Sequence, residues 1–442
     1  MKKLWLLIVL LILGGAGFVY FSPIFEKTPP VIQIKTNGYT NLKQPLEVDI
    51  KDASGIKYYR VTAIYDNKAH VLNNQTVKNR DSELKLKVKL PQLEGKKVTI
   101  KVVAVDNSKW HFFAGNTAKK SASLLIDTTP PSAEVINNSY AIGKGGSAVV
   151  VVYVADKNLK DKYVLVNNKY KFQLTPFVKK GYYITLVAWD INDDKFDAEL
   201  IAEDKAGNIT QIHIPYYWRK YKYPKAKINI SDKFVNTIAV RVLKKMGLSV
   251  PENPVKIFKK VNEEVRALNE KEIAKITKPV RENRVDSFNI ARFNPLPGSA
   301  LKAYFGEKRT YYYKNEPISK AVHKGMDLAK IRHSKIYSSN YGKVVAEKYI
   351  GIYGNVEIIY HKLGLYTLYA HTSSYVKKVN DFVKRGDIIA ITGSSGAVFG
   401  DHLHFGVYIQ GVAVNPKEWM DPHWIKINIL NVINQAKRTI DK

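Results

Sequence analysis

An internal repeat in the first half of the chain most constrains how this sequence can fold. The two copies share an opening and an ending: Thr28-Pro-Pro-Val-Ile-Gln-Ile34 and Thr129-Pro-Pro-Ser-Ala-Glu-Val135, then Ala114-Gly-Asn-Thr117 and Ala206-Gly-Asn-Ile209. Repeated segments of this kind fold as similar units. We therefore expect two related modules in tandem, over residues 28–127 and 128–216.

Both copies contain short segments that are typical of β-strands. The clearest are Leu84-Lys-Leu-Lys-Val-Lys-Leu90, Lys97-Val-Thr-Ile-Lys-Val-Val103 and Ala148-Val-Val-Val-Val-Tyr-Val154. Turn residues separate the strands at short spacing, which favours antiparallel β-sandwiches over alternating strands and helices. With a Pro-Pro opening and a Gly-Asn ending, each copy resembles bacterial immunoglobulin-like (Ig-like) domains. That resemblance implies a spacer or a surface for a protein partner, and no catalysis.

The N-terminus predicts a membrane segment over residues 4–22. Lys2-Lys3 precede an uncharged apolar run from Leu4 to Phe21, at the short end of what can cross a bilayer core of about 30 Å. The basic flank stays inside, so everything after the run should be exported. No clear small-residue cleavage site follows, which favours an uncleaved inner-membrane anchor. A removed signal peptide stays open as the alternative.

Composition narrows the choice of partners and of metal ligands. The chain has no cysteine, which excludes disulfides and thiolate metal sites. Its net charge is +31 at pH 7. Nucleic acid is not expected as a partner, because the basic residues are spread along the chain and the bulk of it is exported. An anionic wall polymer and acidic lipid headgroups are the expected partners, and a solvated basic surface without a specific partner is the alternative.

Residues 217–286 change from strand-like to helical character. After a basic, aromatic stretch, Ser231-Asp232 can cap a helix that ends at Gly247. We expect two further helices, over residues 255–268 and 269–281. This helical insert (residues 231–285) either covers a groove in the segment that follows it or is a rigid spacer. At the other end of the chain, residues 423–442 predict a C-terminal amphipathic helix.

Four fragments near the C-terminus carry the chemistry: His323-Lys-Gly-Met-Asp327, Tyr369-Ala-His371, Gly393-Ser-Ser-Gly396 and His402-Leu-His404. His and Asp bind zinc through nitrogen and oxygen, and a catalytic zinc takes three protein ligands and a water. Residues two apart in a strand share a face, so His402 and His404 project together while Leu403 and Phe405 point into the core. Each fragment alone is weak, but together they predict a metal site. Gly393–Gly396 lacks the Lys-Ser/Thr of a phosphate loop and predicts a tight turn.

Residues 287–422 resemble the lysostaphin/LytM-type zinc peptidases, which cut peptide cross-links in bacterial cell walls. Further matching segments are Gly342-Lys-Val-Val345, Gly354-Asn-Val-Glu-Ile358, Thr367-Leu-Tyr-Ala-His371, Val383-Lys-Arg-Gly386, Ile391-Thr-Gly-Ser-Ser-Gly396 and Val414-Asn-Pro416. The resemblance implies that His323, Asp327 and His404 bind zinc. It places His371 and His402 beside the attacking water.

The chain departs from the family pattern at two positions. Asp401 stands where the family often has Pro, and Gly406 where an acidic residue often follows. Neither is a ligand position, so the departures bear on groove shape and substrate preference.

The expected protein is mainly β and multidomain: an N-terminal anchor helix, two β-sandwich modules, a small helical insert and a C-terminal β-rich peptidase domain. The expected function is zinc-dependent endopeptidase hydrolysis of peptidoglycan cross-links in the cell envelope, as a D,D-endopeptidase that can also act as a carboxypeptidase. The glutamate of an H-E-x-x-H motif is absent, so His371 and His402 must handle the protons. The alternative is a non-catalytic wall-binding regulator or activator of other murein hydrolases.

Overall fold

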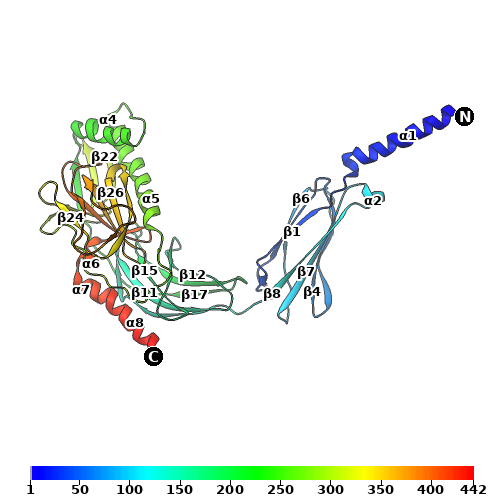
Figure 1. Ribbon diagram of the computed structural model, residues 1–442, viewed down its shortest axis with the longest axis horizontal. Coiled ribbons are helices and arrows are strands. Elements are labelled where there is room, and N and C mark those ends of the chain that lie inside the picture. Colours follow the sequence, from blue (N-terminus) through cyan, green and yellow to red (C-terminus); the bar gives the residue numbers. More distant parts are fainter. Residues whose placement is uncertain (1) are drawn as a thin grey trace. The chain divides into compact units, whose positions relative to one another are not determined.

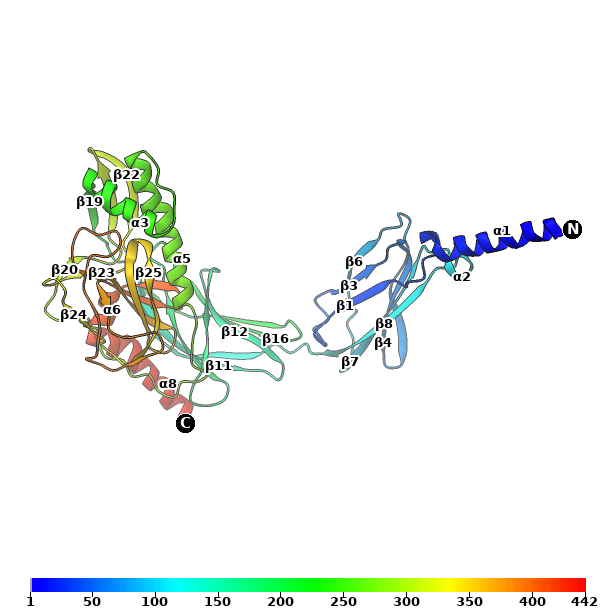
Figure 2. The same cartoon turned by 45° about the horizontal axis from the view of Figure 1, so that its top comes forward.

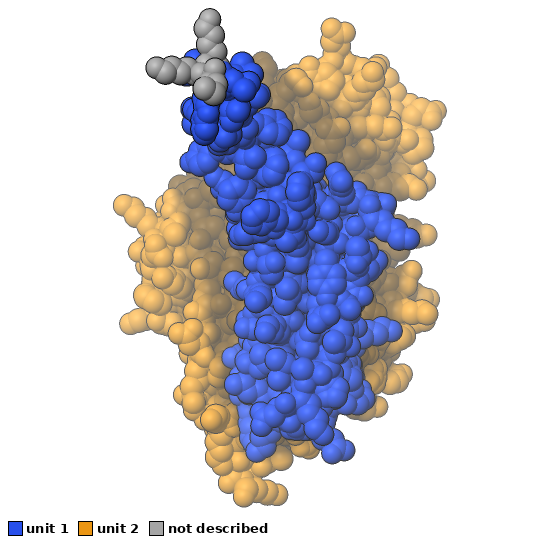
Figure 3. All heavy atoms as spheres, turned by 90° about the vertical axis from the view of Figure 1, so that its right-hand side faces the viewer, with its two compact units in different colours: residues 1–131, 156–161, 203–209 blue, residues 132–155, 162–202, 210–442 orange. Residues whose placement is uncertain are grey.

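The computed structural model describes the backbone of residues 2–442 and the side chains of residues 4–442. The chain forms two compact units, which Figure 3 distinguishes by colour. Unit 1 consists of residues 1–131, 156–161 and 203–209, and unit 2 of residues 132–155, 162–202 and 210–442. Both units are built mainly from β-strands, which confirms the predicted fold class.

Unit 1 begins with one long apolar helix, drawn in blue in Figure 1. Helix α1 (Lys2–Phe21) is followed by a short 3-10 turn, η1 (Pro23–Phe25), that starts at a proline and is capped by Ser22. Residues 4–21 of α1 are long and apolar enough to cross a membrane, and none of them is buried in the protein. The basic flank Lys2-Lys3 lies outside the described side chains.

The rest of unit 1 is formed by two sheets that share one core. The strands are β1 (Val31–Lys35), β2 (Tyr39–Thr40), β3 (Leu46–Lys51), β4 (Ile56–Tyr65), β5 (Lys68–Thr76), β6 (Glu83–Val88), β7 (Lys97–Asp106) and β8 (Thr117–Ile126), with the short helix α2 (Trp110–Phe113) between the last two. The sheet orders are β1-β3-β6 and β2-β8-β7-β4-β5. Alternate residues point to opposite faces of a strand, so Val48 and Ile50 of one sheet and Val98 and Ile100 of the other are all fully buried. The predicted strands at 84–90 and 97–103 are confirmed.

The two repeat endings form the same hydrogen-bonded motif. In the first copy, the Asp106 carboxylate accepts from the backbone N–H (2.7 Å) and the side-chain amide (2.8 Å) of Asn116. In the second copy, Asp204 accepts from the corresponding groups of Asn208 at 2.8 and 2.7 Å. Both aspartates are fully buried, so these bonds satisfy charges that would otherwise be costly. The Asp…Asn pattern of the repeat is therefore structural, while the Ig-like assignment stays a prediction.

Unit 2 contains most of the second copy. Its strands are β9 (Ser132–Asn138), β10 (Ala141–Gly143), β11 (Ser147–Ala155), β12 (Leu159–Val166), β13 (Tyr170–Gln173), β14 (Thr175–Pro176), β15 (Tyr182–Ala188), β16 (Ala198–Asp204), β17 (Ile209–His213) and β18 (Tyr217–Arg219). The strand orders are β14-β15-β11-β9, β13-β12-β16-β17 and β10-β18. Strand β11 confirms the prediction for residues 148–154. The proposed limits of the individual domains stay predictions.

The helical insert follows strand β19 (Lys225–Asn229) in unit 2. Its helices are η2 (Phe234–Ala239), α3 (Val240–Lys245), α4 (Pro254–Lys259), η3 (Lys260–Val265) and α5 (Arg266–Thr277), where η2 and η3 have π-helical bonding. The Ser231 hydroxyl accepts from the Phe234 N–H (3.2 Å), as the predicted cap requires. The two helices expected over 255–268 and 269–281 instead form one uninterrupted stretch, which ends at Thr277. No glycine or proline breaks it, and the buried Asn269 accepts from the Ile352 N–H (2.9 Å).

The C-terminal segment of unit 2 forms a long twisted sheet and two smaller ones. Its strands are β20 (Ala300–Ala303), β21 (Lys308–Tyr313), β22 (Glu316–Val322), β23 (Met326–Ala329), β24 (Lys335–Tyr337), β25 (Gly342–Ile350), β26 (Gly354–Tyr360), β27 (Leu365–Thr372), β28 (Ser374–Tyr375), β29 (Phe382–Val383), β30 (Ile388–Ile391), β31 (Leu403–Ile409) and β32 (Val412–Val414), with the 3-10 turn η4 (Gly351–Tyr353) before β26. The main order is β20-β23-β31-β27-β26-β25-β29, and β24-β30-β28 and β19-β21-β22 form the smaller sheets. Helix α5 lies against β25 of the main sheet (Figure 2).

Helices at the end of the chain join this segment to the second copy within unit 2. They are α6 (Pro416–Met420), α7 (Pro422–Ile425), η5 (Lys426–Leu430) and α8 (Asn431–Asp441). Helix α8 packs on β9 and β11 of the second copy (Figures 1 and 2), and its apolar face is buried as the sequence predicts. The Trp419 indole N–H donates to the Ser147 hydroxyl (3.0 Å), so the C-terminal segment is fastened to β11.

Candidate metal centre

Three side chains from neighbouring strands converge on one point. His323 follows β22, Asp327 lies in β23, and His404 lies opposite Asp327 in the antiparallel pair β23–β31. His323 Nε2 is 3.0 Å from His404 Nδ1 and 3.1 Å from Asp327 Oδ1, and His404 Nδ1 is 2.9 Å from that oxygen. Both histidines are buried. The strand register therefore places two nitrogens and one oxygen around a common point.

These donor atoms fit a metal ion. Ligand atoms of a tetrahedral zinc, with bonds of about 2.0–2.1 Å, lie roughly 3.3 Å apart, close to the spacing seen here. The Nδ1 of His323 donates to the Tyr304 carbonyl (3.0 Å), which leaves its Nε2 lone pair directed at the other two donors. Two imidazoles and a carboxylate are a zinc-type donor set, which completes the fit.

The environment keeps the carboxylate ionised and the second imidazole neutral. Burial alone would raise the pKa of Asp327, but the His323 and His404 rings hold that pKa well below its ordinary value. Burial lowers the pKa of His404 to about 4, although Asp327 opposes the shift. A carboxylate and a neutral imidazole are the protonation states that bind metal.

Gly325 lets the loop before β23 approach the site closely. A Cβ on Gly325 would lie 2.5 Å from His404 Nε2, so any side chain at this position would displace the imidazole. The buried Nε2 of His404 has no hydrogen-bond partner among the side chains and backbone that the structure describes. The Gly in the His323-Lys-Gly-Met-Asp327 fragment is thus required by close packing.

Two more histidines face the same point. The ring of His371, at the end of β27, is 4.9 Å from the His402 ring and 5.8 Å from the His404 ring, measured between centroids. His371 Nδ1 donates to the Ser395 carbonyl (2.9 Å), and His402 Nδ1 donates to the Gly400 carbonyl (2.9 Å). In each histidine Nε2 is thus the nitrogen left facing the cleft, and that of His402 lies 3.8 Å from Asp327 Oδ1.

His371 is unusual in backbone and in charge. Its φ of 64° lies in the left-handed region, which non-glycine residues seldom adopt and which is often found at functional sites. Burial lowers the pKa of His371 well below its ordinary value, and the nearby His402 and His404 rings add to the shift. The imidazole is therefore neutral at physiological pH.

The segment Gly393–Gly396, predicted as a tight turn, positions His371. Gly396 has a φ of 83°, and a Cβ there would lie 2.4 Å from the Ile352 carbonyl oxygen. The Ser395 carbonyl before it accepts from His371, and the Ser395 hydroxyl accepts from the Asn355 N–H (2.9 Å). The segment has a bend at Gly396 and an isolated bridge from Gly393 to His402, not the tight turn that the sequence predicts, and it orients a histidine through the Ser395 carbonyl.

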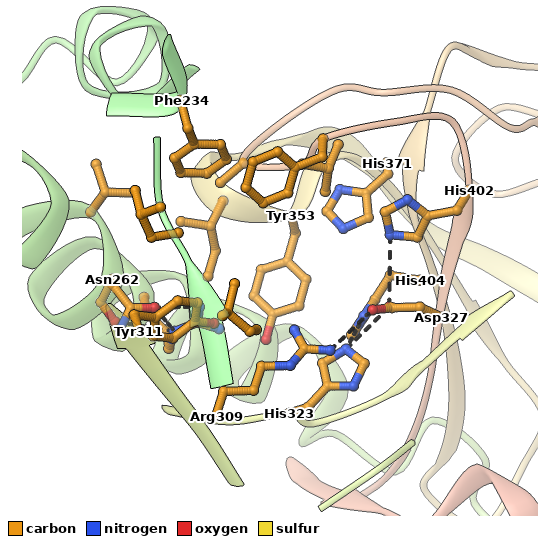
Figure 4. A pocket seen from close by; sticks show the side chains of 18 of the residues that line it. Phe234, Asn262, Arg309, Tyr311, His323, Asp327, Tyr353, His371, His402 and His404 are labelled. Carbon is orange, nitrogen blue, oxygen red and sulfur yellow. Dashed lines mark hydrogen bonds and ion pairs between the residues drawn. The ribbon is translucent and has the colours of Figure 1, made fainter. Parts of the chain in front are cut away.

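All five residues line one cleft of about 310 Å³, which has two walls (Figure 4). The sheet wall comprises Arg309, Tyr311, His323, Lys324, Asp327, Ile352, Tyr353, His371, Ala397, Val398, Phe399, Gly400, His402 and His404. The insert wall comprises Phe234, Phe258, Val261, Asn262 and Arg266 of the helical insert, with Ile228 of β19 and Ile230 just before the insert. In Figure 4 the Tyr353 ring stands between the two walls, and its centroid is 5.3 Å from that of His404.

Arg309 is a site residue that the sequence patterns did not reveal. Its Nη2 donates to Asp327 Oδ2 (3.2 Å) and its Nε to Glu307 (2.8 Å). Because Oδ2 is engaged in this way, Oδ1 is the oxygen that faces the two histidines. The sequence signal that could have revealed Arg309 was the hairpin β21–β22, which ends just before His323. In this hairpin Arg309 pairs with Ala321, two residues before His323.

Histidines outside the four fragments take no part in the site. His361 is buried and both its nitrogens are engaged, with the Tyr341 carbonyl at 2.9 Å and the Thr367 hydroxyl at 2.8 Å. Burial lowers its pKa to about 4. His333 and His423 are exposed and do not line the cleft. His361 is therefore a hydrogen-bonded core residue.

Comparison with known proteins places this segment in a family. Residues 321–416 match the family described as Peptidase family M23. The DD-carboxypeptidase/endopeptidase Mpg of Neisseria meningitidis is 34% identical over 131 residues, which cover 29% of this chain and 28% of that protein. The murein hydrolase activator EnvC of Escherichia coli is 32% identical over 97 residues, which cover 22% of this chain and 23% of that protein. The solved catalytic domain of lysostaphin from Staphylococcus simulans is 25% identical, covers 28% of this chain and 92% of that domain, and has a TM-score of 0.24.

The matched segment, residues 321–416, contains the three converging residues and the two further histidines, five site residues in all. The match spans less than a third of the length of the two curated relatives, so it concerns this part of the chain alone. The C-terminal part of this chain therefore forms a domain of peptidase family M23.

Proposed function

We propose that this chain is a zinc-dependent endopeptidase that hydrolyses peptide cross-links of bacterial peptidoglycan. The observation that carries the proposal is the convergence of His323, Asp327 and His404 in a cleft that also holds two further histidines, His371 and His402. This is a three-ligand metal site with proton-transfer groups beside it, the arrangement that metal-assisted hydrolysis requires.

In this proposal the metal is zinc, held by His323, Asp327 and His404. Zinc at this site would supply Lewis acidity, which polarises the scissile carbonyl and acidifies the attacking water. The side chains of His371 and His402 handle the proton: the one that is neutral accepts it from the water at Nε2, and the other, which would have to carry a proton on both nitrogens, donates a hydrogen bond from Nε2 to the developing oxyanion. Their Nδ1 bonds to Ser395 and Gly400 fix both rings with Nε2 towards the cleft.

The relatives support two candidate functions. The name of the Neisseria relative, a DD-carboxypeptidase/endopeptidase, supports hydrolysis of D,D-peptide bonds, both as an endopeptidase and as a carboxypeptidase. The name of the Escherichia coli relative, a murein hydrolase activator, supports the alternative of a wall-binding regulator without its own activity. We favour the enzyme, because the converging donor atoms and the paired histidines have no use in a purely binding protein.

Digestion of purified peptidoglycan by the full chain in detergent tests the proposal. Mass spectrometry of the soluble products should show opened cross-links, with a new free amino group for each bond cut, and chelator should abolish them. Adding a murein hydrolase to parallel samples separates the two functions. Products that appear only in the presence of that hydrolase would support the activator and contradict the enzyme.

The location that fits this function is the cell envelope. We propose that the helix over residues 4–21 anchors the chain in the inner membrane and that the remainder is exported, where its large excess of basic residues favours the anionic wall polymer. The mature protein should keep residue 1 and stay in the membrane fraction after a high-salt wash. A mature N-terminus near residue 18 or later would show a cleaved signal instead.

A further inference from the structure

The cations of the cleft differ in whether a carboxylate neutralises them. Three cationic side chains line it. Arg309 is paired with Glu307 and Asp327, and Lys324 is paired with Glu270 at 2.7 Å. Arg266, the third, has no carboxylate within ion-pair distance among the side chains of residues 4–442. Its charge is therefore the uncompensated one in a cleft with an apolar wall.

Arg266 is held in place by an uncharged neighbour. Its Nη2 donates to Asn262 Oδ1 (2.7 Å), and its Nε donates to the Asn262 backbone carbonyl (3.1 Å). The amide of Asn262, 3% exposed, donates in turn to the Ser319 hydroxyl (2.8 Å). A guanidinium has five N–H donors, and the two on Nη1 have no partner in the described protein. The side chain is thus oriented, with donors left for a ligand.

Arg266 lies close to the reaction centre. Arg266 lines the same cleft as the five site residues, and helix α5, which begins at Arg266, packs against the turn η4, which ends at Tyr353. The same tyrosine packs edge-on against the His404 ring at 5.3 Å. Arg266 and the candidate metal ligands therefore line one cleft, so a single bound peptide can contact both.

The surroundings of Arg266 indicate the chemistry of its ligand. Phe234, Phe258 and Val261 give the insert wall an apolar surface. A free carboxylate on a short aliphatic group would place its alkyl part on this surface and its two oxygens on the guanidinium fork, a favourable bidentate geometry. Stem peptides of peptidoglycan present carboxylates of this kind on alanine-like residues.

We propose that Arg266 of the helical insert binds a carboxylate of the substrate peptide and thereby determines specificity. This inference rests on the proposed function, because it takes the substrate to be a stem peptide of the wall. It makes the insert part of the binding site, in addition to whatever covering or spacing role it has. Arg266 belongs to a stretch, residues 254–277, that lies before the family match, so this recognition element lies outside the matched segment.

A comparison of two substrates tests the proposal. The probes are a soluble cross-linked muropeptide dimer and the same dimer with its carboxylates converted to amides. Two quantities are measured for each: kcat/KM with the metal-loaded full chain, and Kd with the chelated full chain. Wild-type protein should favour the acid form by roughly tenfold or more in both. Arg266→Gln should reduce that preference to about one, and Arg266→Lys should fall between.

The matched control is Lys271→Gln, which removes one positive charge from an exposed position of the same helix, α5. It should keep the full preference for the acid form. Thermal melting of each variant identifies loss of folding, which would weaken both substrates equally. An unchanged acid preference in Arg266→Gln, or no preference in wild-type protein, would overturn the inference. If neither dimer is cleaved but acid-selective binding depends on Arg266, the proposed function fails and the recognition role stands.

Discussion

The two walls of the cleft differ in what they contribute. The sheet wall carries the candidate metal ligands and the histidine pair on strands whose register aligns them, such as Asp327 opposite His404. The insert wall carries aromatic and aliphatic side chains and one uncompensated arginine, Arg266. Groups that react need fixed geometry, which a sheet supplies, whereas groups that select a substrate need a complementary surface. The difference implies a division between chemistry and recognition.

The division also follows the family match. Residues 321–416, which match peptidase family M23, include the candidate metal ligands and the histidine pair of the sheet wall, whereas the insert residues of the other wall lie at 234–266. Substitutions in the sheet wall should therefore affect metal content or turnover. Substitutions in the insert wall should mainly affect substrate binding, so the two classes are distinguishable by measurement.

The largest effect is expected from the three candidate ligands. His323→Ala, Asp327→Ala and His404→Ala should each abolish the one tightly bound zinc and lower activity by roughly 10³-fold or more, because each removes one of three ligands. Metal analysis of the purified variants checks this. His423→Ala, at an exposed histidine, is the control and should keep full zinc content. A ligand variant with wild-type zinc content would remove that residue from the site.

The histidine pair should separate turnover from metal binding. His371→Ala and His402→Ala should retain zinc and lower kcat by ~10²-fold or more, because the proton-transfer group is lost while the ligands stay. Zinc content and kcat are measured on the same samples. Near-normal kcat with zinc retained would exclude that histidine from the mechanism.

A smaller effect is expected from the insert wall. The Phe234 ring packs 4.5 Å from the ring of Phe399, in the loop that leads to His402. Phe234→Ala should raise KM by about tenfold and leave kcat and zinc content close to wild type, because apolar binding surface is lost without a reacting group. Phe112→Ala, at a fully exposed phenylalanine, is the control. A fall in kcat alone would contradict the division between the walls.

The smallest effect on activity is expected from a substitution of Glu357, a buried carboxyl outside the cleft, which should change the stability of the fold instead. Glu357 of β26 is fully buried and pairs across the sheet with Tyr369, and its oxygens have no partner within the described residues. Burial raises the pKa of Glu357 to about 9, with a further contribution from Glu347. In the unfolded chain the same carboxyl ionises near ~4.3.

The sign of the pH effect follows from these two values. The raised pKa favours folding most below pH ~4, and this contribution is progressively lost as the pH rises towards about 9. Glu357→Gln cannot ionise, so it should raise the free energy of unfolding at pH 8 by about 1–3 kcal/mol and change it little at pH 4. Denaturant titrations at both pH values measure this. A stabilisation that is equal at both would show that ionisation is not the cause.

The sequence predicted the sheet wall well because its chemistry is carried by local patterns. The alternation in His402-Leu-His404 places both histidines on one face and Leu403 in the core, and the structure has Leu403 fully buried. Gly396 likewise marks a position of positive φ, at 83°. A strand's period and a turn's composition are properties of consecutive residues, so they are visible without a structure.

The insert wall could not be predicted in the same way. Asn262 and Arg266 look like ordinary polar positions of a helix, and only the packing of the insert on Ser319 and on η4 gives them a place in the cleft. The single helical stretch over 254–277 was expected as two helices, since no local signal shows that the buried Asn269 bonds to η4. Tertiary contacts between distant segments determined these features.

The central claim is that one metal ion, held by His323, Asp327 and His404, is required for hydrolysis of the wall. Titration of zinc into the chelated full chain, with release of peptidoglycan products followed at each step, tests it most directly. Activity should rise from zero in proportion to added zinc, reach a plateau at one equivalent per chain, and stay at zero in His404→Ala. Full activity in the chelated chain, or its restoration by zinc in His404→Ala, would contradict the account.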